Sequence, residues 1–444
     1  MYAGKHTSRL QVHKLLLKVV NPALSTSNDS TCYLPGHYHL NVAEGWSRFA
    51  LRFSEYYQSL GTSDLWCPPR FRSREWMFVP WGTRPPDRHR GFTDKGGLLH
   101  YLHTKSPHSC FHSTAYYRDP SQRNMADKDW LGADLIFDLD GDHLPGVSDR
   151  DFPAMIGLIQ DQTWKLWSEF LEPEFGFLEQ HVQIAFSGHR GFHIHVRDPA
   201  YLQLDSNARR QLVNYIRGEG ISVQAVVDNT EGGWKTRVEA GIDGVLENLQ
   251  SIAQESQDKN LLLDEMYGIM KQRIRNPNCT VRSCSKTKLV QLAEQSLDEE
   301  RVDRLREDHG LTVFPGDNTS VFWELVKGDS SVVLGAAGET DENVTVDVKR
   351  VIRWIGSLHG KCGLRVTELP LNRLNPDAAD AFDPLSEAVA LGGDSSHKIE
   401  LTMDDVTARV SETHVEGSSG DVFEVPESMA TFLSLKGWGT LISP

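Results

Sequence analysis

The chain has 444 residues, 39% of them hydrophobic and 11 of them tryptophan, which is enough for one large domain with insertions or for two to three domains. It has no run of about 18 or more apolar residues, so no segment is expected to span a membrane. The net charge of −15 weighs only mildly against nucleic acid as a partner, because local basic clusters are what bind phosphates. Six scattered cysteines form no paired framework and indicate a reducing cytoplasm.

The pattern along the chain predicts an α+β core interrupted by a helical insertion. Residues 1–43 are expected to form a weakly structured extension, because they include a polar, turn-prone tract. We expect the first part of the core over 44–204, the helical insertion over 205–320, and the second part of the core with a C-terminal segment over 321–444.

Shorter patterns predict individual elements within this frame. Helical spacing predicts helices over 46–57 and 160–172, and a strand over 74–80 is expected to end at a proline. Strand-like sequence returns over 344–355. These elements surround the segments that carry the chemistry.

Residues 134–142 read Asp-Leu-Ile-Phe-Asp-Leu-Asp-Gly-Asp and predict a buried strand. Apolar residues alternate there with Asp138 and Asp140, which therefore point to one face. Two carboxylates in this position repel each other unless a cation compensates them, and a divalent metal is the usual compensator. The alternative is a pair of solvated acids on an edge strand, which the apolar flanks disfavour.

Residues 182–196 predict a hairpin of two apolar strands around the turn Ser-Gly-His-Arg-Gly. The turn region offers backbone N–H groups together with Ser187, Arg190 and His193, which are groups that hold phosphates. The alternative is a plain loop with exposed basic residues. Metal-binding acids beside a phosphate cradle suggest phosphoryl or nucleotidyl transfer.

A third region, 341–361, mixes acidic and basic residues with a Gly-Ser-Leu-His-Gly-Lys loop. This composition suits a third metal ligand and further phosphate contacts, and the alternative is a charged surface strand and turn. Cys279 and Cys284 have a spacing close to that of a zinc site, but no second pair or histidine lies nearby.

Taken together, these motifs resemble the small catalytic subunit of archaeal and eukaryotic DNA primase, the archaeal form most closely. The resemblance runs from about Trp46 to the C-terminus and is densest at Arg74-Glu-Trp, Arg88-His-Arg, 134–146, 186–196, 341–366 and Phe382-Asp-Pro-Leu. It implies a primase-type catalytic core of mixed β-sheets with flanking helices and an inserted helical subdomain. Many family members carry a zinc knuckle, but residues 141–186 contain no cysteine, so structural zinc is not expected.

The resemblance also implies roles for single residues. Three aspartates of the family hold two metal ions, Mg²⁺ or Mn²⁺, and they fall on Asp138, Asp140 and Asp341, with Asp347 as a rival for the last. The triphosphate contacts fall on Ser187, Arg190, His193 and His359, with Arg353 where a basic residue is expected. Arg74 and either Arg88 or His89 match basic positions that line the same pocket.

The expected function is therefore template-directed synthesis of short primers from nucleoside triphosphates on single-stranded DNA, by two-metal nucleotidyl transfer, in the nucleoid. The resemblance implies a heterodimer with an iron–sulfur large subunit, since the six scattered cysteines cannot hold that cluster. The main alternative is a haloacid dehalogenase-like phosphatase with Asp138 as nucleophile and Asp140 as general acid. That alternative leaves the first 130 residues unexplained, and we find no late acidic motif for it. A non-catalytic nucleic-acid-binding subunit is disfavoured by the intact carboxylates.

Overall fold

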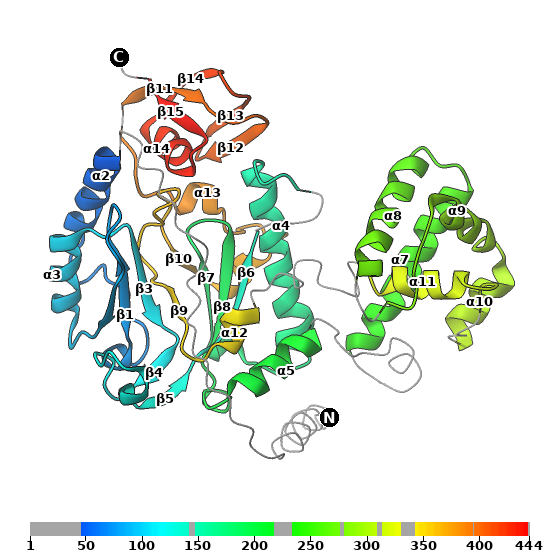
Figure 1. Ribbon diagram of the computed structural model, residues 1–444, viewed down its shortest axis with the longest axis horizontal. Coiled ribbons are helices and arrows are strands. Elements are labelled where there is room, and N and C mark those ends of the chain that lie inside the picture. Colours follow the sequence, from blue (N-terminus) through cyan, green and yellow to red (C-terminus); the bar gives the residue numbers. More distant parts are fainter. Residues whose placement is uncertain are drawn as a thin grey trace. The chain divides into compact units, whose positions relative to one another are not determined.

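The computed structural model describes residues 46–141, 147–216, 233–275, 279–308, 313–329, 342–393 and 395–442. In these parts helices flank antiparallel sheets, which confirms the predicted α+β class (Figure 1). The extension predicted over 1–43 lies outside the described residues. The chain divides into a first unit of Met1–Trp164, Phe175–Arg210 and Glu339–Pro444, and a second unit of Lys165–Glu174 and Gln211–Gly338. The insertion predicted over 205–320 overlaps the second unit from residue 211 onward.

The first sheet of unit one has the order β2-β1-β3-β9. Its strands are β1 (Trp76–Val79), β2 (Asp87–Arg90), β3 (Ser109–Ser113) and β9 (Val351–Arg353). Two helices, α2 (Trp46–Ser59) and α3 (Lys95–Lys105), flank this sheet (Figure 1). Their buried side chains, among them Phe53, Tyr57 and Leu98, pack with Trp76 and Trp354 into one apolar core. This core fixes the sheet that carries β9.

The second sheet has the order β10-β7-β8-β6 and carries both predicted motifs. Its strands are β6 (Leu135–Asp140), β7 (Val182–Phe186), β8 (Gly191–Val196) and β10 (Thr367–Leu369). Met155 of α4 (Phe152–Lys165) packs against Gly141 at the end of β6. The helix α12 (Glu342–Val346) packs on β6, where Val344 meets Ile136 and Ile352. The strand predicted over 344–355 is therefore wrong at its start, which is helical, and right at β9.

Shorter elements complete this part of the unit. They are β4 (Ala115–Tyr117) and β5 (Trp130–Ala133), which pair with each other, α13 (Pro384–Glu387), and the 3₁₀ turns Phe71–Ser73, Met125–Lys128, Glu179–His181 and Leu371–Leu374. The π-helical turn Leu166–Leu171 belongs to the second unit, and the helix α5 (Ser206–Ile216) has residues in both units. The helix predicted over 160–172 is thus formed by the end of α4 and the π-helical turn.

A C-terminal module closes unit one. It consists of β11 (Ser396–Leu401), β12 (Val406–Val410), β13 (Thr413–Gly417), β14 (Val422–Pro426), α14 (Glu427–Lys436) and β15 (Gly439–Leu441). Three of these strands form the sheet β14-β11-β15, and β12 pairs with β13. The helix α14 buries Met429, Phe432 and Leu433 and ends at Gly437, whose φ of 71° suits glycine.

The second unit is helical in its described parts. Its helices are α7 (Gly233–Ala253), α8 (Lys259–Arg275), α9 (Lys286–Gln295), α10 (Glu299–Asp308) and α11 (Asn318–Val326). Leu246 and Leu249 of α7 are buried, as are Leu289 and Leu292 of α9, against which α7 packs. In the portions of the chain that are described, every helix is too short or too polar to cross a membrane.

Candidate active site

The two carboxylates of β6 lie opposite the hairpin strand β8. Asp138 pairs in register with His193, and Asp140 pairs with Gly191. The apolar neighbours Phe137 and Leu139 are only 1% exposed, whereas the side chains of Asp138 and Asp140 are 20% and 47% exposed. The predicted alternation of buried apolar side chains and acids along this strand is therefore present. It leaves both acids on a face that solvent or a ligand can reach.

Each of these acids has a basic partner from the hairpin. The Nε2 atom of His193 lies 3.3 Å from Oδ1 of Asp138, and Nε of Arg190 lies 3.6 Å from Oδ1 of Asp140. The backbone N–H of Gly141 donates to the carbonyl of Arg190 at 3.0 Å, which ties the end of β6 to the turn. The predicted acids and the predicted phosphate-binding turn are thus brought together.

The side chain of Ser187 helps to hold the Ser187–Arg190 turn in one conformation. The backbone N–H of Ser187 donates to the carbonyl of Gly191 at 2.8 Å, and the N–H of Gly191 donates back to the Ser187 hydroxyl at 3.1 Å. Gly188 has a φ of +81°, and a Cβ there would lie 3.1 Å from Cβ of His359. The thiol of buried Cys362 donates to the Gly188 carbonyl. The turn therefore needs a glycine and contacts the loop around His359 directly.

Two neutral imidazoles stack at this contact. The rings of His189 and His359 are 4.7 Å apart at an angle of 14°, and both residues are buried. Burial lowers the pKa of His359 well below its usual value, and the charge of Arg353 lowers it further. Burial also lowers the pKa of His189, with the charge of Lys436 as the next cause. Both rings are therefore neutral near pH 7.

Positive charge gathers around these rings. Arg190, Arg353, Lys361 and Lys436 each act on the pKa of at least one of the two histidines. Such a concentration of cations favours an anionic ligand. Arg190 and Arg353 are predicted contacts, and Lys361 belongs to the predicted loop. Sequence reasoning missed His189, although it stands inside the turn, and it missed Lys436, which no local pattern marks.

Arg74 has a different setting from the predicted one. Its side chain is fully buried, and Nη2 lies 2.9 Å from Oδ2 of Asp134, which is also fully buried. Its other donors go to the carbonyls of Pro69, Ser113 and Thr114. A guanidinium without exposed surface and with its donors engaged holds the fold together. This placement argues against the predicted nucleotide contact for Arg74.

Arg88 and His89 gather around another buried acid. Nη2 of Arg88 and Nδ1 of His89 lie 3.4 and 3.1 Å from Oε1 of Glu75, and Nζ of Lys128 lies 3.4 Å from Oε2. Glu75 is fully buried, whereas Arg88 and His89 keep 25% of their side-chain surface. Their partner is thus Glu75, the residue just before β1, and not a carboxylate of β6.

The third metal ligand remains a prediction. Asp341 lies outside the described residues. Asp347 is described and exposed, and its Oδ1 accepts the backbone N–H of Lys349 at 2.9 Å. Within the described ranges, no group of three or more aspartate, glutamate, histidine or cysteine side chains is arranged to hold a metal ion.

Comparison with known proteins places this site in a family. Residues 137–371 match the family model described as DNA primase small subunit, and the match begins one residue before Asp138. The DNA primase small subunit PriS of Methanothrix thermoacetophila is 36% identical over 414 residues, which cover 87% of this chain and 96% of the relative. The chain belongs to the DNA primase small subunit family.

Further archaeal relatives agree with this assignment. The DNA primase small subunit PriS of Methanocella arvoryzae is 33% identical, with 87% of this chain and 96% of the relative covered. That of Haloarcula marismortui is 31% identical, with 87% and 95% covered. The resemblance to the archaeal form is therefore confirmed, and the phosphatase alternative gains no support.

Proposed function

We propose that this chain joins nucleotides on a single-stranded DNA template and so makes primers by nucleotidyl transfer. The observation that carries the proposal is the pairing of β6 with β8, which sets Asp138 opposite His193 and Asp140 beside the Ser187–Arg190 turn. Carboxylates and a phosphate cradle are the two components that this reaction needs, and one pair of strands supplies both.

The carboxylates fit a divalent metal by their chemistry. Asp138 and Asp140 offer oxygen donors from one strand face, which suits Mg²⁺ or Mn²⁺, and Asp341 is the proposed third ligand. When bound, the metal ions would lower the pKa of the attacking hydroxyl and neutralise charge on the triphosphate. Arg190, the present partner of Asp140, already places a cation beside this acid, which supports the proposal.

The turn and the stacked histidines would hold the triphosphate. The guanidinium of Arg190 can donate to two phosphate oxygens at once. Neutral His359 can donate one hydrogen bond to a phosphate oxygen from its protonated ring nitrogen. Arg353 and Lys361 add positive charge beside it. Most of the rate gain would come from holding the reacting groups in line and from stabilising charge on the phosphates.

The proposal includes a partner that supplies what this chain lacks. We propose a large subunit with an iron–sulfur cluster, which would help to start the primer. The isolated chain should then extend an existing primer faster than it initiates one, and the large subunit should raise initiation selectively. Equal initiation by the lone chain and by the pair would leave the partner a structural or regulatory role.

One assay separates this proposal from its rivals. The chain is incubated with single-stranded DNA, Mg²⁺ or Mn²⁺ and labelled nucleotides. New or extended oligonucleotides support nucleotidyl transfer. Release of inorganic phosphate without oligonucleotides would favour the phosphatase reading, and retention of the template without any product would favour a binding subunit.

A further inference from the structure

The C-terminal helix α14 reaches the nucleotide site through its last residue. Nζ of Lys436 lies 3.0 Å from Nε2 of His189, in the middle of the Ser187–Arg190 turn. The ammonium group also lies 4.9 Å from the ring centroid of Phe152 and 4.4 Å from that of Trp438. Two aromatic faces therefore hold the cation beside the imidazole.

The chemistry of the two groups fixes the direction of this hydrogen bond. A lysine ammonium can only donate, so Nε2 of His189 must accept and the ring proton must sit on Nδ1. This is consistent with the burial of His189, which keeps the ring neutral. Lys436 thus selects one tautomer and one orientation of the imidazole.

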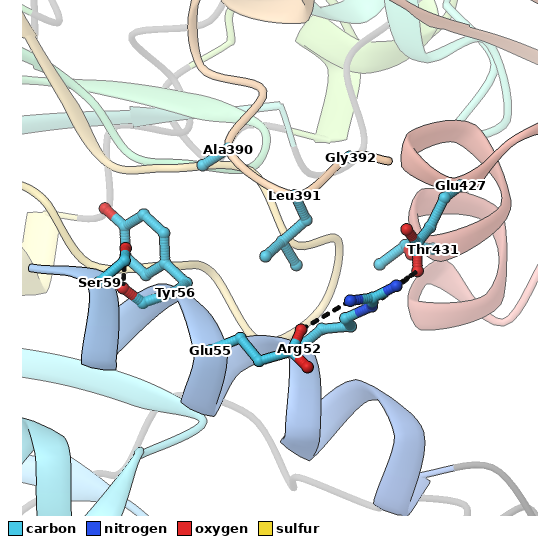
Figure 2. Close-up of a pocket in the computed structure, with 9 residues that line it drawn as sticks. All are labelled: Arg52, Glu55, Tyr56, Ser59, Ala390, Leu391, Gly392, Glu427 and Thr431. Carbon is cyan, nitrogen blue, oxygen red and sulfur yellow. Dashed lines mark hydrogen bonds and ion pairs between the residues drawn. The ribbon is translucent and has the colours of Figure 1, made fainter. Parts of the chain in front are cut away.

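The other end of α14 is anchored to a distant part of the first unit. Figure 2 shows Arg52 of α2 reaching Glu427, the first residue of α14. Oε1 of Glu427 accepts from Nε of Arg52 at 2.7 Å and lies 2.6 Å from Nη2, and Glu427 is only 3% exposed. The buried face of α14 packs between these two ends. A ten-residue helix of about 15 Å that is fixed at its start can hold Lys436 in place at its end.

We propose that Lys436 is a positioning residue of the nucleotide site, which acts through His189 on the Ser187–Arg190 turn. The inference rests on the proposed nucleotidyl transfer, to which it adds a requirement for the C-terminal module. His189 carries the effect in two directions, since it precedes Arg190 in the turn and stacks on His359. Loss of the Lys436 contact releases the ring and loosens both proposed phosphate ligands.

The first test compares single variants in primer extension. Lys436→Met keeps the length of the side chain and removes the donor, and it should raise KM for the nucleotide about tenfold with a smaller change in kcat, as expected for one charged hydrogen bond. Lys436→Arg keeps charge and donor and should restore most of the affinity. Lys398→Met is the matched control, because Lys398 is exposed on β11 of the same module. A wild-type KM for Lys436→Met would overturn the inference.

The second test asks whether Lys436 acts through His189. His189→Phe keeps a ring for stacking and removes the acceptor, so Lys436→Met should add nothing to the KM of the His189→Phe variant. Full additivity of the two substitutions would mean that Lys436 contacts the nucleotide directly, and it would overturn the positioning role.

A readout without catalysis separates this inference from the proposed function. In ¹⁵N spectra of the histidine rings, His189 should hold its proton on Nδ1 in the wild type and in Lys436→Arg, and should show mixed tautomers in Lys436→Met. An unchanged His189 signal in Lys436→Met would overturn the inference even if the enzyme makes primers. Absence of primer synthesis by the wild type would instead overturn the proposed function.

Discussion

Arg74→Met should destabilise the first unit without a selective effect on the nucleotide. Both partners of the Arg74–Asp134 ion pair are fully buried, with 2.9 Å between Nη2 and Oδ2. Removal of one partner from a buried pair costs roughly 3–5 kcal/mol, because the other charge stays in a low dielectric. Asp134 would keep Arg197, whose Nε lies 3.1 Å away, and the hydroxyl of Tyr116. We therefore expect the lower end of the range, about 3 kcal/mol.

Thermal unfolding measures this loss. At about 2 °C per kcal/mol, which applies to domains of roughly 250 residues, the melting temperature of Arg74→Met should fall by about 6 °C. Arg118→Met is the matched control, because Arg118 also pairs with an aspartate, Asp129, but both side chains are more than half exposed. Its melting temperature should match that of the wild type.

Kinetics of the same variants complete the test. Below its melting transition, Arg74→Met should bind nucleotide with a KM close to that of the wild type. A variant that melts like the wild type but needs much more nucleotide would refute this reasoning. It would return Arg74 to the role of a nucleotide contact.

Three further perturbations follow from the same geometry. Arg190→Ala should raise KM for the nucleotide and slow the chemistry with template binding unchanged, whereas a selective loss of DNA affinity would make the turn a template contact. Gly188→Ala should lower the free energy of unfolding by about 1–2 kcal/mol, because φ is +81° and the new Cβ would crowd His359. The same substitution should raise KM for the nucleotide. Unchanged kinetics would mean that the turn does not contact the nucleotide. Burial raises the pKa of Asp134, but the charges of Arg74 and Arg197 outweigh burial and lower this pKa overall. The ion pairs of Asp134 therefore stabilise the fold above the unfolded pKa of about 3.9. This stabilisation is lost as pH falls through the lowered pKa of the folded state. The melting temperatures of wild type and Asp134→Asn should therefore differ most near neutral pH and converge in acid, and a gap that widens in acid would contradict this assignment.

The motifs that could be predicted are those that a local sequence pattern marks. The alternation around Asp138 and Asp140 appears as β6, and the hairpin predicted from apolar strands and a glycine-bounded turn appears as β7 and β8. Their pairing follows from the same alternation, because a slip by one residue would turn both acids into the core.

Other features depend on contacts that no local pattern records. Arg74 meets Asp134 across 60 positions and Lys436 meets His189 across 247, so their roles depend on tertiary structure. The β-branched residues at 344–346 favour a strand, but Val344 instead packs from α12 onto Ile136. Burial against a neighbouring strand outweighed the local preference there.

The central claim is that Asp138 and Asp140 carry the chemistry of nucleotidyl transfer. Asp138→Asn and Asp140→Asn keep the shape of each side chain and remove its charge. In single-turnover extension of a labelled primer on a DNA template, with saturating nucleotide and Mg²⁺ or Mn²⁺, each variant should form no phosphodiester bond above background while it still retains the template. Extension by either variant at the wild-type rate would contradict the account.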